Sequence, residues 1–357
     1  MYGILSRDKV VVTGLESDSS EFRGYGRKMD KGGKDESENN VTLSLEEAAF
    51  LLEAGKLVIT KGRGKKHVLT FEEFLKHSLD LVPNFGARYI VYKDLKERGY
   101  LVQPAGVDFW LYPRGAKPDA KPARYFIRIL SEREFLAVKD LEGLLDLAHN
   151  MRKEPIIAVV DDESDITYYE VKGATFDAIG KRATREGGNG KESGKAFLLG
   201  DKVILWDTDL AVDLYKNDFY GALTKENRLL LSFVEAAYLI KRGLLDLDLD
   251  AFVEHAASVE SNFTAKYAVY EDLREKGLTA KTGFKFGSHF RVYKALDQKH
   301  SLDLIHVLPH EHVFSMPELA RAVRLAHGVK KRMVFSFKAA AGEESRIRYV
   351  DIGRMKL

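Results

Sequence analysis

The chain has 357 residues, with 56 Lys and Arg side chains against 54 Asp and Glu, and it has no cysteine. This length is enough for two or more domains, and a composition that is 45% hydrophobic with 20 Phe and 16 Tyr is globular rather than disordered. The absence of cysteine excludes disulfide frameworks, thiol catalysis, iron–sulfur clusters and Cys-ligated zinc, and no apolar run approaches the roughly 20 residues that span a bilayer.

The first half of the chain mixes strand and helix patterns. Residues 4–12 predict a β-hairpin, and the polar tract 16–40 that follows predicts an inserted loop. Ser44 with Glu47 three residues later is a capping box, so a helix is expected to start there. Further helices are predicted over 71–81, 87–98 and 141–151, and strands over 100–102, 109–112, 125–130, 156–160 and 166–171.

The same pattern is then written a second time. Residues 89–99 return as 267–277 and residues 147–153 as 325–331, both with a shift of 178. Residues 43–52 match 231–240, and residues 8–11 match 201–204, so four matches keep their order while the shifts drift, as loop insertions would cause. The matching elements of the second half are a hairpin over 197–205, helices over 249–259, 266–276 and 316–327, and strands over 290–293, 302–307, 333–337 and 346–350.

We therefore expect a mixed α/β (α+β) fold built by tandem duplication. Each copy has a small α/β N-terminal subdomain and a C-terminal subdomain in which a helix packs on a mixed sheet. The predicted divisions are 1–82 (with the insertion 16–40), 83–172, a Gly-rich linker over 173–194, then 195–262 and 263–357.

The near-neutral charge hides an uneven distribution. Residues 281–357 contain 15 Lys or Arg and 7 Asp or Glu, a local +8, so the preceding 280 residues carry about −6 to leave the total of +2. The C-terminal segment is thus expected to attract a polyanion, unless the excess is random scatter.

Differences between the two copies point to the site of chemistry. Tyr293, His300 and Lys331 lie in the second copy, whereas the first keeps Tyr112 and Lys153 but has no His where we align His300, near Arg124 or Tyr125. A Tyr, a His and a Lys without a carboxylate partner suit metal-free acid–base chemistry, such as attack of a ribose 2′-hydroxyl on its own phosphate.

Three segments of the second copy give the chain its resemblance. Residues 281–293 read Lys-Thr-Gly-Phe-Lys-Phe-Gly-Ser-His-Phe-Arg-Val-Tyr, His300 is followed by Ser301, and residues 321–335 read Arg-Ala-Val-Arg-Leu-Ala-His-Gly-Val-Lys-Lys-Arg-Met-Val-Phe. Over essentially its whole length the chain resembles the archaeal tRNA-splicing endonucleases, in particular those with two tandem copies per polypeptide of which only the second is catalytic.

The resemblance implies a role for each site residue. Tyr293 would activate the 2′-hydroxyl, His300 would protonate the 5′-leaving oxygen, and Lys331 would stabilise the pentavalent phosphate. The implied products are a 2′,3′-cyclic phosphate and a 5′-hydroxyl, formed without a metal or other cofactor. Arg324 and Arg354 match the family's two arginines that sandwich a flipped bulge base, which is physically sensible because guanidinium planes stack on unpaired bases.

The resemblance also implies partners. The substrate would be precursor tRNA with a bulge–helix–bulge, which requires two active sites, so a chain with one intact site is expected to form a homodimer. Asp119 is our candidate for an acidic loop that docks on the partner copy, although an ordinary exposed loop is an equal interpretation. We expect a cytoplasmic protein with no DNA or membrane partner.

Two alternatives stand beside this reading. A non-catalytic tRNA-binding or assembly subunit would share the fold without cleaving, and the intact Tyr293, His300 and Lys331 argue against it. A metal-dependent nuclease would need a carboxylate cluster near the basic segment, which the sequence lacks. The pair His310 and His312 does not have the His-x-x-x-His spacing of helical zinc sites, so no metal site is predicted.

Overall fold

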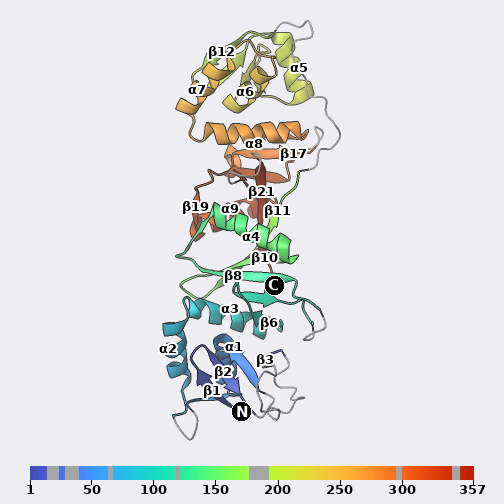
Figure 1. The fold of residues 1–357 in the computed structure, drawn as a ribbon. Helices are drawn as coiled ribbons and strands as arrows, with labels where there is room; N and C mark the ends of the chain where they lie inside the picture. The colour runs from blue at the N-terminus through green and yellow to red at the C-terminus, as the bar shows by residue number, and fades with distance from the viewer. Residues whose placement is uncertain are drawn as a thin grey trace. The chain divides into compact units, whose positions relative to one another are not determined.

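The computed structural model of the chain describes residues 1–13, 24–28, 40–62, 67–116, 121–176, 193–294, 300–339 and 346–357. They form two compact units (Figure 1): residues 1–134, 144–170 and 355–357 make the first, and residues 135–143 and 171–354 the second. In these described ranges, no helix has the length and hydropathy needed to cross a bilayer.

The N-terminal part of the first unit is a five-stranded sheet in the order β3-β4-β2-β1-β5, packed by two helices. Its capping box is confirmed: the Ser44 hydroxyl accepts from the Glu47 amide while the Glu47 carboxylate accepts from the Ser44 amide. The elements are β1 (Tyr2–Ser6), β2 (Lys9–Val12), β3 (Arg27–Lys28), β4 (Val41–Ser44), α1 (Leu45–Glu53), β5 (Val58–Lys61) and α2 (Phe71–Leu81).

The C-terminal part of the first unit is a mixed sheet with strands in the order β6-β7-β8-β10-β11, against which α3 packs. The pair β8 and β10 is parallel, and the other neighbouring pairs are antiparallel. The elements over residues 85–173 are α3 (Phe85–Glu97), β6 (Val102–Pro104), β7 (Phe109–Leu111), β8 (Tyr125–Ser131), β9 (Phe135–Ala137), α4 (Val138–Met151), β10 (Glu154–Val160) and β11 (Ile166–Gly173). Of these, β9 and the first residues of α4 belong to the second unit.

The second unit repeats both parts. Its N-terminal sheet has the order β12-β13-β15-β14, and its C-terminal sheet the order β16-β17-β18-β20-β21, covered by α8 (Figure 1). The N-terminal elements are β12 (Ala196–Leu199), β13 (Lys202–Leu205), α5 (Thr208–Asp218), β14 (Ala222–Leu223), β15 (Leu229–Leu231), α6 (Phe233–Lys241) and α7 (Leu249–Val259). The C-terminal elements are α8 (Phe263–Glu275), β16 (Thr279–Thr282), a 3-10 turn (Phe284–Phe286), β17 (Phe290–Tyr293), β18 (Asp303–Val307), β19 (Val313–Ser315), α9 (Met316–Gly328), β20 (Arg332–Lys338) and β21 (Ile347–Met355).

Specific hydrogen bonds recur in both copies. The hydroxyl of Tyr168 donates to Asp94 over 2.7 Å, and that of Tyr349 donates to Asp272 over 2.6 Å, so each sheet is tied to its covering helix in the same way. Together with the matching strand orders, these bonds confirm the predicted α/β class and tandem duplication.

Two predicted loops contain structure. Most of the tract 16–40 lies outside the described residues, but Gly26 donates its amide to Glu47, as Gly221 donates to Glu235 in the second copy, both over 2.9 Å. The first residues of the tract 173–194 belong to the second unit, because Phe176 is buried against Tyr349 at a ring-centroid distance of 4.9 Å. Helix α5 was not predicted from the sequence.

One continuous hydrophobic core holds the second unit together. It runs from Val203 and Leu205 in the N-terminal sheet, through Tyr270 on α8, to Val334 and Tyr349 in the C-terminal sheet. Because the core spans both subdomains, we expect this unit to unfold as one.

Candidate active site at one end of the second sheet

The topology of the second sheet brings the predicted catalytic residues to one end of it. Tyr293 ends β17, His300 lies shortly before β18, and Lys331 directly precedes β20. Because β17 is antiparallel to β18, and β18 is parallel to β20, the end of the first strand and the starts of the other two meet at the same edge.

Lys331 is placed by the end of α9. Lys330 has a left-handed backbone (φ 54°), its amide donates to the His327 carbonyl, and the Lys331 amide donates to the Ala326 carbonyl over 2.9 Å, which is a Schellman motif. This turn directs the Lys331 side chain so that its ammonium donates a hydrogen bond to the backbone carbonyl of Ser301.

The surroundings of Lys331 modify its charge. Burial lowers the pKa of its ammonium, the positive charge of Arg291 lowers it further, and Asp303 acts in the opposite direction. The ammonium also lies 5.5 Å from the centroid of the Phe286 ring. Lys331 is therefore a half-buried cation at the sheet edge, joined to the residue that follows His300.

His300 is exposed, next to the buried Ser301. The hydrogen bond from Lys331 to Ser301 holds the backbone next to His300 in place. The imidazole ring of His300 is itself exposed to solvent. The residues 295–299 that connect Tyr293 to His300 lie outside the described residues.

Tyr293 is partly buried, and its ring lies 5.7 Å from the guanidinium carbon of Arg291. Thr279 on β16 is the residue that pairs with Tyr293 in the sheet. Within the described part of the chain its hydroxyl has no hydrogen-bond partner, so it is available to bind a ligand.

An ion pair that the sequence analysis missed lies beside these residues. Arg332 donates from Nε to Oδ1 of Asp303 over 2.6 Å, and its Nη1 lies 3.7 Å from Oδ2 of Asp351. Asp303 raises the pKa of Arg332 through that hydrogen bond. The pair joins the first residues of β18 and β20. Ser301 and Lys331 come just before these residues in the chain, so the ion pair holds the two strand starts together beside the site.

Arg324 and Arg354 are both exposed, on α9 and β21 respectively. In the ladder between β20 and β21, Val334 faces Asp351, so continuing this register places Arg354 opposite Lys331. Among the described residues no contact joins Arg324 to Tyr293, His300 or Lys331.

The first unit contains the same frame with different side chains. Lys153 donates to the Ala123 carbonyl over 2.7 Å, as Lys331 does to Ser301, but the Tyr112 hydroxyl donates to Gln103 over 2.6 Å. The tyrosine of the first copy is thus tied to an amide. The second copy has Lys281 in place of Gln103, and this lysine donates instead to the Gly221 carbonyl over 2.7 Å.

The register also corrects the expected counterpart of His300. Tyr125 faces Glu154 in the first sheet and Asp303 faces Arg332 in the second, so both strands follow the shift of 178. His300 therefore corresponds to Pro122, and not to Arg124 or Tyr125 as the sequence alignment placed it. Proline has no side chain that titrates, so the first copy has no group at this position that could give or take a proton.

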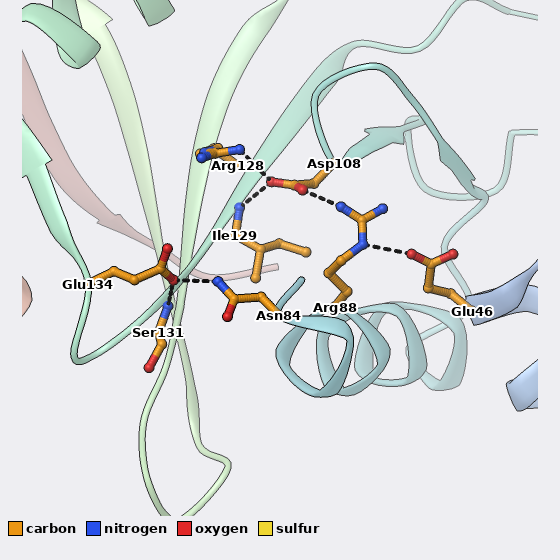
Figure 2. Close-up of polar contacts among 8 residues, drawn as sticks. All are labelled: Glu46, Asn84, Arg88, Asp108, Arg128, Ile129, Ser131 and Glu134. Carbon is orange, nitrogen blue, oxygen red and sulfur yellow. Dashed lines mark hydrogen bonds and ion pairs between the residues drawn. The ribbon is translucent and has the colours of Figure 1, made fainter. Parts of the chain in front are cut away.

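Histidines elsewhere in the second sheet are structural. His289 accepts a hydrogen bond at Nδ1 from the Val307 amide over 2.9 Å, and its ring lies 4.5 Å from that of His306. Burial lowers the pKa of His289 to about 3, and His306 and Lys266 act in the same direction, so the ring is neutral near pH 7. In the first copy Asp108 takes this place: it accepts from the Ile129 amide over 2.8 Å and pairs with Arg88 (Figure 2).

No three His, Asp or Glu side chains in the described ranges lie close enough together to hold a metal ion. The Asp119 loop falls in residues 117–120, outside the described residues.

Comparisons with known proteins agree with the arrangement of the two copies. A family model described as tRNA intron endonuclease, catalytic C-terminal domain, matches residues 85–168 and 263–349, and the N-terminal domain model of the same family matches residues 1–75 and 194–253. The chain is 41% identical over 345 residues to a protein of Methanococcoides burtonii named tRNA-splicing endonuclease, covering 93% of each chain. Proteins of the same name from Methanosarcina mazei and Haloarcula marismortui are 41% and 35% identical, over 97% and 94% of this chain and 97% and 93% of their own lengths.

Proposed function

The chain belongs to the tRNA intron endonuclease family, and we propose that it cleaves precursor tRNA at the two intron junctions. The observation that carries this proposal is the meeting of Tyr293, His300 and Lys331 at one sheet edge of the second copy. The first copy has the same frame but replaces the histidine by Pro122 and engages its tyrosine with Gln103.

The reaction that these groups suit is a transesterification. The 2′-oxygen forms a bond to phosphorus as the bond from phosphorus to the 5′-oxygen breaks, which leaves a 2′,3′-cyclic phosphate and a 5′-hydroxyl. Tyr293 takes the proton of the 2′-hydroxyl, and His300 gives a proton to the 5′-oxygen. Lys331 stabilises the negative charge that develops on the phosphorane. No water and no metal enters this balance.

Recognition of the cleavage point is assigned to Arg324 and Arg354. Both are exposed cations, and the register of β20 and β21 supports a position for Arg354 beside Lys331. A base flipped out of a bulge can stack between two guanidinium planes, which would place the neighbouring phosphate at Lys331. A bulge–helix–bulge presents two such bases.

Two cleavages need two sites. Because only the second copy has the complete set, we propose that two chains associate so that each supplies one site. The role of Asp119 at that interface, the cytoplasmic location and the absence of DNA and membrane partners stay predictions from the sequence.

The test uses an end-labelled precursor with a bulge–helix–bulge, incubated with the full chain in EDTA. We expect fragments with a 2′,3′-cyclic phosphate and a 5′-hydroxyl, and a rate lowered at least about 100-fold in His300→Ala. Fragments with 5′-phosphate ends, or a His300→Ala variant as fast as the wild type, would refute the mechanism. Tight binding of precursor without cleavage would favour the alternative of a non-catalytic tRNA-binding subunit.

A further inference from the structure

Arg291 lies next to the proposed catalytic groups, and the function described above gives it no role. It stands two residues before Tyr293 on β17, so both side chains project from the same face of the sheet. Its guanidinium carbon lies 5.7 Å from the centroid of the Tyr293 ring. Arg291 therefore lies beside Tyr293 at the end of the sheet where the site forms.

The hydrogen bonding of Arg291 is incomplete. Its Nε is buried and has no hydrogen-bond partner among the described residues. Buried donors without a partner are rare in folded proteins, and one that lies next to a site can be explained by an ion or ligand that binds there. The ring of Tyr293 beside it offers no oxygen or nitrogen acceptor in the plane of the guanidinium, so the N–H groups of Arg291 stay available to donate to a ligand.

A second cation, Lys331, lies on the same face of the sheet. Arg291 faces Leu304 on β18 and Leu304 faces Met333 on β20, and Lys331 comes two residues before Met333. The charge of Arg291 acts on the Lys331 ammonium strongly enough to lower its pKa, which means that the two cations repel each other. The nearby carboxylate of Asp303 does not relieve this repulsion in full, because its Oδ1 is engaged by Arg332. Two cations held on one sheet face, with their nearest carboxylate already paired, form a site for an anion.

The first copy shows what the frame looks like without this pair. The strand registers place Trp110 where the second copy has Arg291, since Gln103 faces Trp110 and Lys281 faces Arg291. There the Lys153 ammonium lies 5.1 Å from the centroid of the Trp110 ring, so an aromatic face takes the place of the second cation. The two-cation arrangement thus belongs to the copy that also has the histidine.

We propose that Arg291 and Lys331 together bind the non-bridging oxygens of the scissile phosphate. This inference rests on the proposed cleavage of RNA and adds a residue to it. The phosphorane carries more negative charge on these oxygens than the diester does, so both cations bind it more tightly than they bind the substrate. A guanidinium can donate two parallel hydrogen bonds to two oxygens of one phosphate, which an ammonium cannot do.

The experiment measures single-turnover cleavage by Arg291→Gln, Arg291→Lys and Arg291→Trp. We expect Arg291→Gln to lose about 10²- to 10³-fold in rate, the effect of removing one preorganised donor to a developing oxyanion. Arg291→Lys should recover part of that loss because it keeps the charge. Arg291→Trp should be as slow as Arg291→Gln while melting near the wild-type temperature, because the first copy folds with Trp110 at the same place. Arg321→Gln, which removes an exposed cation from α9, is the matched control and should cleave at the wild-type rate.

Two further measurements separate binding of the transition state from a structural effect. Affinity for a precursor with 2′-deoxyribose at the junction, which cannot react, should fall far less than the rate does in Arg291→Gln. If both cations hold one phosphate, the loss in Arg291→Gln combined with Lys331→Gln should be smaller than the product of the two single losses.

The outcomes distinguish this inference from the function on which it rests. A wild-type chain that does not cleave the precursor overturns both. A slow Lys331→Gln variant together with an Arg291→Gln variant of normal rate overturns the role of Arg291 alone. The same follows if the two losses multiply in full, or if Arg291→Gln loses affinity and rate in equal measure.

Discussion

Asp303→Asn should lower the free energy of unfolding of the second unit more than neutralising an exposed charged side chain would. The Asp303 side chain is 1% exposed and accepts from Arg332 Nε over 2.6 Å. Asparagine has the same shape but no charge, so the substitution leaves the Arg332 guanidinium facing a neutral amide at the start of two adjacent strands.

The magnitude follows from how well water can replace the lost partner. Breaking a fully buried ion pair costs about 3–5 kcal/mol because one charge stays buried and unpaired. The Arg332 side chain is 47% exposed and keeps Asp351 at 3.7 Å, so solvent and the second carboxylate recover part of that cost. A hydrogen bond to a charged group contributes about 1.5–3 kcal/mol, and we expect a loss of about 2 kcal/mol in the free energy of unfolding.

The first copy supplies the control. Arg124 pairs with Glu154 at 3.0 Å near the same edge of its sheet, but the side chains are 56% and 39% exposed. Exposed pairs of this kind contribute about 0–1 kcal/mol, so Arg124→Gln should change stability little.

The assay is equilibrium unfolding in urea. The chain has two tryptophans, Trp110 in the first unit and Trp206 in the second, so a Trp110→Phe background lets fluorescence report on the second unit alone. Asp303→Asn should lower the midpoint of that transition and leave its slope unchanged. Equal midpoints for Asp303→Asn and Arg124→Gln would show that burial does not set the strength of this pair.

Three more substitutions test single features of the structure. Lys330→Gly should stabilise the protein by about 1 kcal/mol, since a left-handed backbone is costly for a residue with Cβ, and thermal melting checks this. Arg152 has the same conformation in the first copy, so Arg152→Gly should stabilise the protein to a similar extent. Tyr293→Phe should slow single-turnover cleavage at least about 100-fold, whereas Tyr112→Phe should not, and comparable losses would contradict the assignment of catalysis to the second copy. His289→Asn should reduce the loss of stability on acidification, measured by urea unfolding from pH 7 to pH 4. The pKa of His289 is about 3 in the folded protein against an ordinary 6.5, so the unfolded chain binds the proton first as the pH falls, and the wild type loses up to about 3 kcal/mol by pH 4 that the non-titrating variant keeps. Identical pH profiles would contradict a neutral, buried His289.

The sequence predicted the regular elements best where a local signal was strong. Helices α2 and α7 have the predicted bounds, and the capping box at Ser44 forms because both of its members lie within one turn. Helix α5 was missed because it buries only Ala211 and Leu214, and its acidic residues interrupt a short apolar face. Its Asp207 cap was the signal that could have found it.

The proposed catalytic residues come from the resemblance, whereas the contacts that support them could not be predicted from the sequence. Asp303 and Arg332 are 29 residues apart and become neighbours only through the parallel ladder of β18 and β20, which no local pattern specifies. The correspondence of His300 with Pro122 likewise needs the strand register, because the loops before β8 and β18 differ and sequence similarity there is low.

A comparison of the two copies shows how the same backbone arrangement can present a different charge distribution in each copy. Both end their helix with a left-handed residue, and both send the next lysine to a backbone carbonyl, so the position of that lysine is a property of the fold and not of catalysis. The charge around the lysine is what differs. Trp110 and Glu154 in the first copy give way to Arg291 and Arg332 in the second, which replaces one aromatic ring and one anion by two cations. Glu154 is paired with Arg124, however, and Arg332 with Asp303, so these charges are largely neutralised within each copy. The remaining difference is Arg291 in place of Trp110, so a phosphodiester meets one more cation at the second edge than at the first.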